Sequence, residues 1–241
     1  MKKHIPNTLT CCNLISGCIA TYWAFNANYE LALLFVVIGA VFDFFDGFAA
    51  RLLHVSSNIG KELDSLADDI TFGFAPSAVI FSMLRSLSTP QVPLFNSPLV
   101  AEVLPYVAFV MAAFSALRLA KFNLDERQTT SFIGMPTPAN ALFWTSLSVA
   151  IQFNTEHIPA NAYAIMLIAG TFIASWLLVA EIPMFALKFK SYGLKGNELR
   201  YGFRLVSILL LILLGITAFS AIIILYVLTS VALDFFTNQL K

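Results

Sequence analysis

Four aspartates within an apolar stretch are the residues of this chain best suited to chemistry. Asp43 and Asp46 are three residues apart, which places them on one face of a helix. Asp64 and Asp68 are four residues apart and share a helix face in the same way. An ionised carboxylate in an apolar, membrane-type segment is expensive and usually marks a functional site. Since like charges disfavour one another, four such carboxylates need compensating cations.

Divalent metal ions are the simplest compensation for this set of ligands. Carboxylate oxygens suit hard cations, so we expect Mg²⁺ or Mn²⁺, with Ca²⁺ as a further option, and not zinc or copper. Two ions bridged by carboxylates would form a clamp for a phosphoryl group. The sequence therefore predicts a site for two divalent cations, made by Asp43, Asp46, Asp64 and Asp68.

Small and basic residues beside the first aspartate pair fit the same chemistry. Gly47 follows Asp43 by about one turn, and Ala50 follows Asp46 in the same way. Such small residues leave room for a bulky phosphate or nucleotide group. Arg51 can form two parallel hydrogen bonds to a phosphate. This end of the helix is therefore predicted to bind a phosphorylated group.

The beginnings of two predicted helices add further candidate binding groups. Gly60 opens the helix that carries Asp64, where free backbone N–H groups favour an anion. Asn7 and Thr8 stand at the start of the first apolar run and could offer side chains on the same membrane face. Asp68 is the best candidate for a catalytic base, because Asp64 can bridge metals while Asp68 faces an acceptor.

The composition indicates a membrane protein. The chain has 241 residues, of which 59% are hydrophobic and 12% are charged, and its mean hydropathy is +0.80. Soluble domains have about 25% charged residues. Repeated long apolar runs predict an all-α, polytopic membrane bundle. The net charge of zero gives no indication of nucleic-acid binding, and we expect a single domain over residues 1–241.

The apolar runs predict eight membrane spans. The last run, 205–237, exceeds the roughly 20 residues that one span needs, so we interpret it as two spans hinged near residues 215–219. The other spans are expected at about 8–27, 30–52, 60–84, 99–121, 138–153 and 161–187. Pro76 predicts a kink in the third span, and Glu181 falls inside the sixth.

The basic residues predict the orientation in the membrane. With eight spans and both termini in the cytoplasm, every Lys and Arg except Arg85 falls on the cytoplasmic side. The same orientation places the four aspartates near the cytoplasmic ends of the second and third spans. We therefore expect a multi-pass protein of the cell membrane whose site draws a water-soluble reactant from the cytoplasm and a lipid from the bilayer.

The spacing of these residues resembles a family signature. The pattern Asp-x2-Asp-Gly-x2-Ala-Arg-x8-Gly-x3-Asp-x3-Asp is similar to that of the CDP-alcohol phosphotransferase family at each fixed position, namely Asp43, Asp46, Gly47, Ala50, Arg51, Gly60, Asp64 and Asp68. The resemblance implies an integral membrane enzyme, usually a homodimer, that attacks a CDP-linked lipid and releases CMP.

The resemblance also implies a role for each residue of the site. Asp43 and Asp64 would contact both metals. Asp46 would contact one metal and Asp68 the other, with Asp68 as the base. The implied contacts to the CDP group come from Gly47, Arg51 and Ser57. The stretch 6–9, which contains Asn7 and Thr8, resembles the nucleotide-contacting segment of the family.

Other stretches are similar to the phosphatidylserine synthase branch of that family, which uses CDP-diacylglycerol and L-serine. They are residues 64–68, 72–76, 116–123 and 132–139, and the resemblance covers roughly residues 5–145. Serine is a zwitterion, so its site needs a cation for the carboxylate and an acceptor for the ammonium group. Arg118, Lys121 and Asn123 cluster at the end of the fourth span, and the first two could bind the carboxylate.

Several alternatives stay open on the sequence. Glycerol-3-phosphate or another phosphorylated acceptor would also need basic residues, so this cluster does not decide the acceptor. Arg118 and Lys121 could also be plain cytoplasmic anchors. Paired carboxylates inside a membrane occur in cation transporters, although the chain lacks the paired, broken halves of many transporters. We interpret Asp69 as a neighbour bonded to a polar group, and Glu181 as a residue that hydrogen-bonds another helix.

Overall fold

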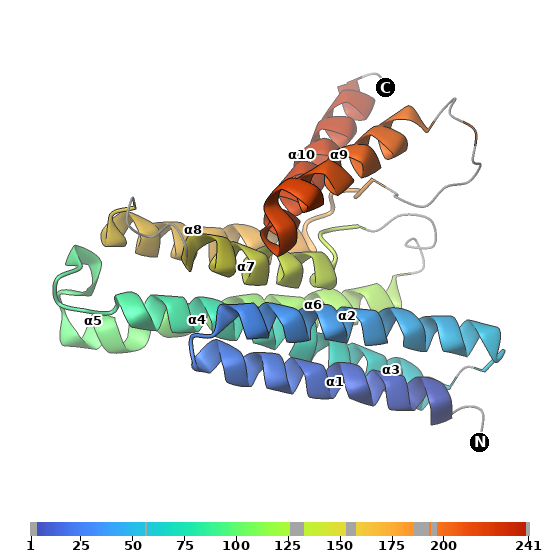
Figure 1. Ribbon diagram of the computed structural model, residues 1–241, viewed down its shortest axis with the longest axis horizontal. Helices are drawn as coiled ribbons and strands as arrows, with labels where there is room; N and C mark the ends of the chain where they lie inside the picture. Colours follow the sequence, from blue (N-terminus) through green and yellow to red (C-terminus); the bar gives the residue numbers. More distant parts are fainter. Residues whose placement is uncertain are drawn as a thin grey trace.

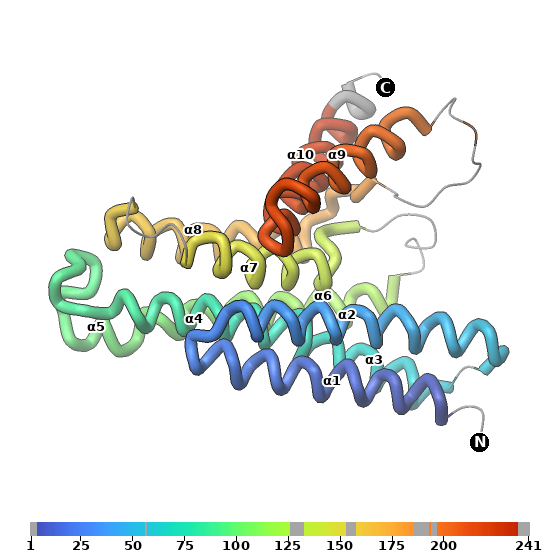
Figure 2. Tube along the Cα trace, in the orientation of Figure 1, coloured from blue at the N-terminus to red at the C-terminus, as the bar shows by residue number. Residues whose placement is uncertain are grey.

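Helices side by side form the body of the molecule (Figure 1). The computed structural model describes residues 4–55, 57–125, 133–152, 158–185, 193 and 197–239, with side chains as far as residue 235. Most of the helices run along one common direction, while a C-terminal pair projects from them at an angle (Figure 2). The predicted all-α fold class is confirmed.

The first two helices form a hairpin. α1 (His4–Phe25) turns back into α2 (Tyr29–Leu52), and the Asn28 side chain caps α2 by accepting from the Leu31 backbone N–H at 3.1 Å. The predicted spans at 8–27 and 30–52 match these two helices closely. Because the hairpin is tight, the start of α1 lies at the same end of the bundle as the last turns of α2.

The predicted third span is one continuous rod with an irregular middle. α3 (Asn58–Asp68) passes into a π-helical segment, η1 (Asp69–Phe74), and then into α4 (Ala75–Leu87). Pro76 has no backbone N–H to donate, so the regular hydrogen-bonding ladder cannot continue through it. Just before the proline the structure has a wider π-helical turn, and the kink predicted at Pro76 stays a prediction. Such turns are frequent at functional sites.

Glycines let η1 lie close against the α1–α2 hairpin. A Cβ atom at Gly39 would come within 2.5 Å of Thr71 Cγ2, and one at Gly17 would also collide with Thr71. The Thr71 hydroxyl donates to the Asn13 backbone carbonyl at 3.0 Å. Close approach through small residues, joined by an interhelical hydrogen bond, is the usual packing of membrane helices.

The fourth and fifth predicted spans have clear counterparts. The fourth consists of α5 (Pro98–Val103), a 3₁₀ segment η3 (Leu104–Phe109) and α6 (Val110–Leu124), preceded by a short 3₁₀ turn η2 (Pro93–Phe95). The fifth is α7 (Thr137–Gln152). α6 therefore carries the predicted cluster of Arg118, Lys121 and Asn123.

The sixth predicted span is too long, and Glu181 lies outside it. α8 (Ala160–Val179) ends where Ala180 adopts an extended backbone with ψ of 142°. Pro183 disfavours helical backbone in the residue before it and removes a donor, so the helix cannot continue to residue 187. The interpretation of Glu181 as a residue within a membrane helix was wrong.

Two helices, not one, make up the last apolar run. α9 (Glu198–Leu214) and α10 (Ala218–Gln239) form a hairpin through a 3₁₀ turn, η5 (Gly215–Thr217). Gly215 has φ of +59°, a backbone conformation that glycine adopts without strain. The predicted break near residues 215–219 is confirmed. Most of the basic loop before α9 lies outside the described residues.

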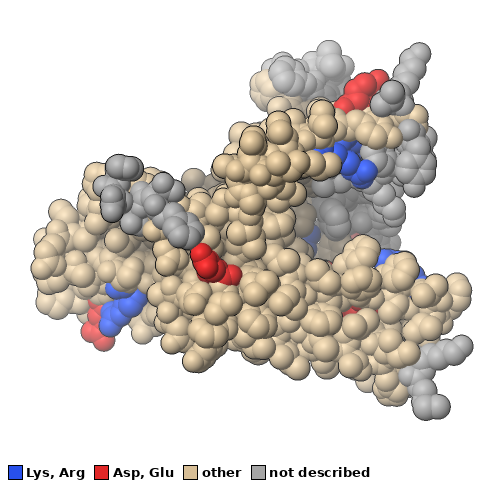
Figure 3. Space-filling view, in the orientation of Figure 1, with Lys and Arg blue, Asp and Glu red and all other residues tan. Residues whose placement is uncertain are grey.

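Five stretches of the described chain are long and apolar enough to cross a membrane. They are Tyr29–Leu52, Asn58–Leu87, Pro98–Leu124, Ala160–Val179 and Glu198–Phe235, the last containing both α9 and α10. The face of the molecule seen in Figure 3 carries few charged side chains among the described residues, which suits contact with lipid. The protein is a multi-pass membrane protein, and the number of eight spans stays a prediction.

Candidate active site

Three carboxylates from two neighbouring helices meet at one point. Asp43 near the end of α2 and Asp64 and Asp68 in α3 each offer an oxygen, and these atoms lie within 4.8 Å of one another. The helix faces deduced from the spacing of the aspartates are thus turned toward each other. One oxygen of Asp64, Oδ1, is buried and has no hydrogen-bond partner among the described residues.

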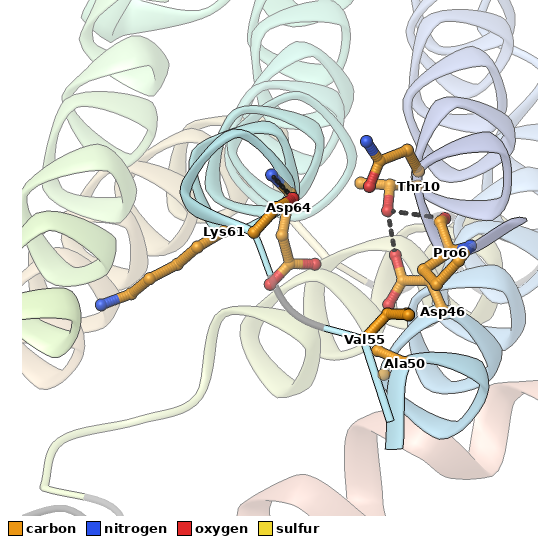
Figure 4. A pocket seen from close by; sticks show the side chains of 11 residues that line it. Pro6, Thr10, Asp46, Ala50, Val55, Lys61 and Asp64 are labelled. Carbon is orange, nitrogen blue, oxygen red and sulfur yellow. Dashed lines mark hydrogen bonds between the residues drawn. The ribbon is translucent and has the colours of Figure 1, made fainter. Parts of the chain in front are cut away.

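Asp46 is close to this group but is held differently. Its side chain is only 6% exposed, and its Oδ2 accepts a hydrogen bond of 2.6 Å from the Thr10 hydroxyl of α1. It is not one of the three carboxylates that share the 4.8 Å cluster. Asp46 and Asp64 instead point from opposite sides into the same cavity (Figure 4).

α1 contributes a second bond to the aspartates. The Asn13 side chain is fully buried, and its Nδ2 donates to Asp68 Oδ1 at 3.0 Å. Thr10 and Asn13 are three residues apart, so they lie on one face of α1. Neither residue was among the site residues predicted from the sequence. The signal that could have identified them is their helical spacing with Pro6, which places all three on one face of α1.

A cleft of about 260 Å³ opens beside the carboxylates. Its walls come from the start of α1, the end of α2 and the start of α3. Five residues predicted to bind the CDP group line it, namely Asn7, Gly47, Ala50, Ser57 and Gly60. Val55, Lys61, Pro6 and Thr10 complete the lining together with Asp46 and Asp64.

The start of α3 is built so that the cleft stays open. The Ser57 hydroxyl accepts from the Gly60 backbone N–H at 3.0 Å and so caps the helix. A Cβ atom at Gly60 would lie 3.0 Å from Ser57 Oγ and 3.1 Å from Asn7 Oδ1. A larger residue at Gly60 would therefore push both neighbours and narrow the cleft.

Two other residues predicted to bind the CDP group, Arg51 and Thr8, lie at the edge of the cleft or outside it. The exposed Arg51 guanidinium folds back over Gly47, with its NH1 3.6 Å from where a Cβ atom would stand. It can therefore reach the cleft from its rim. The Thr8 hydroxyl donates to the His4 carbonyl at 2.8 Å, and Thr8 does not line the cleft.

The predicted acceptor residues do not form one cluster. Arg118 and Lys121 line a smaller cavity together with Asp125 and Glu181. Asn123 instead joins α6 to α3: its Nδ2 donates to Ser65 Oγ at 2.8 Å, and its backbone carbonyl accepts from Lys61 Nζ at 3.1 Å. The Lys61 side chain accordingly extends away from the cleft (Figure 4).

Comparison with known proteins identifies relatives with a shared name. The chain is 35% identical over 180 residues to the CDP-diacylglycerol–serine O-phosphatidyltransferase of Bacillus subtilis, a match covering 75% of this chain and 89% of that protein. Proteins of the same name from Mycobacterium leprae and Saccharomyces cerevisiae are 31% and 32% identical over 188 and 165 residues. Those matches cover 75% and 62% of this chain and only 57% and 55% of the relatives.

The family model described as CDP-alcohol phosphatidyltransferase matches residues 3–185. The matched range contains the carboxylate cluster, the cleft beside it and Glu181. It ends before α9 and α10. The chain therefore belongs to the CDP-alcohol phosphatidyltransferase family.

Proposed function

We propose that this protein transfers the phosphatidyl group of CDP-diacylglycerol to L-serine and releases CMP. The observation that carries the proposal is the meeting of Asp43, Asp64 and Asp68 beside a cleft lined by the residues of the family signature. The relatives that share the name CDP-diacylglycerol–serine O-phosphatidyltransferase support serine as the acceptor.

The carboxylates fit a pair of divalent cations. Their donors are all oxygens, which suits Mg²⁺, Mn²⁺ or Ca²⁺, and the buried Asp64 Oδ1 has no hydrogen-bond partner among the described residues. Asp43, Asp64 and Asp68 would hold the ions, with Asp46 at the edge of the group. When bound, such ions neutralise the pyrophosphate of the substrate and the charge on the departing CMP.

The cleft would hold the CDP group. The small residues Gly47, Ala50 and Gly60 leave space in the cleft for this group. Arg51 on the rim can bind a phosphate through two parallel hydrogen bonds. The Gly60 N–H that the sequence predicted to be free is bonded to Ser57, but the positive end of the α3 helix dipole still favours a negatively charged group at this place. Together these residues orient the pyrophosphate toward the carboxylates.

Asp68 would act as the base. Asn13 holds its Oδ1, which leaves the other oxygen to accept a proton from the serine hydroxyl. The serine oxygen forms a bond to the phosphorus that carries diacylglycerol. The bond from that phosphorus to the oxygen shared with CMP breaks, and CMP leaves. No other reactant is needed.

The test compares acceptors. The purified protein is given CDP-diacylglycerol with Mg²⁺ or Mn²⁺ and either L-serine or glycerol-3-phosphate, and CMP release is measured. We expect release with serine only. CMP release with glycerol-3-phosphate and none with serine would support the phosphatidyl transfer but reject serine as the acceptor. Ion flux in liposomes without any CMP release would favour a cation transporter.

The family resemblance supports one further proposal, on assembly, and the basic residues support another, on orientation. The enzyme would work as a homodimer, which the mass of the protein in detergent would test. Its termini and active site would face the cytoplasm. In this orientation every Lys and Arg except Arg85 falls on the cytoplasmic side, where basic residues of membrane proteins are in excess.

A further inference from the structure

A second polar cavity lies between α6 and the segment that follows α8. It is lined by Arg118, Lys121, Asp125, Ile133, Leu178, Val179, Ala180 and Glu181, and it shares no residue with the nucleotide cleft. Its volume of about 40 Å³ is room for a few water molecules. Two cationic and two anionic side chains surround this small space, so it suits a small group that carries both charges.

The floor of the cavity lies on the helix that packs beside the carboxylates, because α6 contacts η1, the segment that begins right after Asp68. The Arg118 side chain on α6 is only 7% exposed. It also lies 5.3 Å from the centre of the Phe122 ring, which fixes its plane. Lys121, one turn later on α6, is exposed at the rim. A molecule held by these cations would therefore lie against the helix that packs next to the end of α3, where Asp68 stands.

The opposite wall is held rigidly by backbone contacts. The Gly134 N–H donates to the Ile182 carbonyl at 2.9 Å, and the Met135 N–H donates to the Leu177 carbonyl at 2.9 Å. Gly134 has φ of +75°, and a Cβ atom there would lie 2.7 Å from the Leu178 carbonyl oxygen. These contacts fix the backbone on both sides of Glu181, whose exposed side chain lines the cavity together with the residues of α6.

We propose that Glu181 recognises the ammonium group of the acceptor amino acid, while Arg118 and Lys121 hold its carboxylate. This inference rests on the proposed function. Glu181 is favoured over Asp125 because it comes from the wall opposite the cations, whereas Asp125 follows them at the end of α6. A phosphorylated acceptor would bring negative charge against Glu181, so the same residue disfavours glycerol-3-phosphate.

The experiment compares L-serine with 3-hydroxypropanoate, which has the same carboxylate and hydroxyl but no ammonium group. We expect Glu181→Gln to raise the KM for serine on the order of 10- to 100-fold, the range for losing a hydrogen bond to a charged group. The KM for CDP-diacylglycerol should change less than about twofold. The ratio of kcat/KM for serine to that for 3-hydroxypropanoate should fall by a similar 10- to 100-fold.

Two further variants make the result specific. Glu102→Gln makes the same change at an exposed position of α5, away from the cavity, and should keep the wild-type ratio. Glu181→Asp keeps the charge and should retain most of the preference for serine, so it tests the idea even if the amide variant is poorly folded. A serine KM and acceptor ratio in Glu181→Gln equal to those of Glu102→Gln would overturn the inference.

The proposed function can fail separately. If the wild-type protein released CMP with glycerol-3-phosphate and not with serine, both the serine assignment and the role of Glu181 would be wrong. If the wild type used serine and Glu181→Gln used it equally well, only the role of Glu181 would be lost.

Discussion

The residues that hold the site are as informative as the carboxylates themselves. Thr10 and Asn13 on α1 each donate to one aspartate, Asp46 and Asp68 respectively. Each bond fixes one oxygen of a carboxylate. A hydrogen bond to a charged group contributes more than a neutral one, about 1.5–3 kcal/mol. The α1 helix therefore orients the site from a third direction without offering a carboxylate of its own.

Replacing the proposed base tests its role directly. Asp68→Asn keeps the shape of the side chain but cannot take a proton, so we expect CMP release to fall on the order of 10²- to 10⁴-fold. Binding of CDP-diacylglycerol, measured by calorimetry in detergent, should remain, because the cleft is lined by other residues. Turnover near the wild-type level would remove Asp68 as the base.

Removing the amide that holds Asp68 should have a smaller effect. We expect Asn13→Ala to lower kcat about 10-fold, because Asp68 loses the donor that fixes its Oδ1. Asn26→Ala is the matched control, since Asn26 follows α1 and its Nδ2 bonds only the nearby Tyr22 carbonyl at 2.7 Å. Equal kcat values for the two variants would contradict the positioning role of Asn13.

The sequence predicted the carboxylates better than their partners. The aspartates could be found because the spacing within each helix fixes which side chains share a face. The pairing of Asn13 with Asp68 depends on how α1 is rotated against α3, which no local pattern specifies. Asn123 shows the same limit: it is close in sequence to Arg118 but bonds Ser65 on another helix.

Between the elements, the contact of η1 with the α1–α2 hairpin determines where the site forms. η1 begins immediately after Asp68, and Thr71 within it packs against Gly17 and Gly39. This contact fixes the position of the last turn of α3 relative to α2, and hence of Asp68 relative to Asp43. The π-helical turn rotates the following helix without breaking the rod.

A methyl group at this contact should destabilise the bundle. We expect Gly39→Ala to lower the free energy of unfolding by about 1–3 kcal/mol, because the new Cβ atom would collide with Thr71. Gly202→Ala in α9 is the control, since a Cβ atom there meets nothing within 4 Å. Thermal unfolding of both variants in detergent is the measurement. A melting temperature of Gly39→Ala at or above that of Gly202→Ala would contradict this packing.

Helix ends were predictable where the length of an apolar run and a glycine within it coincide, and less so where pairing between distant segments contributes. The break between α9 and α10 followed from the length of the run and the glycine at its centre. The end of α8 did not, because the segment 180–185 is apolar apart from Glu181. Its backbone leaves the helix to pair with Gly134, a contact between segments more than 40 residues apart in the chain.

At the scale of the whole molecule, the site lies at one end of the bundle. The carboxylates are close to the turn between α2 and α3, and η2 and α5 lie at the opposite end (Figure 1). A reaction between a lipid and a water-soluble amino acid requires such a position, because the charged reactant cannot enter the apolar centre of a membrane. The orientation of the protein in the membrane therefore determines from which side the water-soluble reactant enters the site.

Accessibility of cysteines would settle the orientation. Cys11, Cys12 and Cys18 are first replaced by serine, and single cysteines are introduced as Asn58→Cys at the site end or Asn96→Cys at the opposite end. Both asparagines are exposed. We expect a membrane-impermeant maleimide to label Asn96→Cys in intact spheroplasts and Asn58→Cys only after lysis, because the distribution of basic residues predicts that the site end faces the cytoplasm. The reverse pattern would put the active site on the outer surface and contradict the predicted orientation.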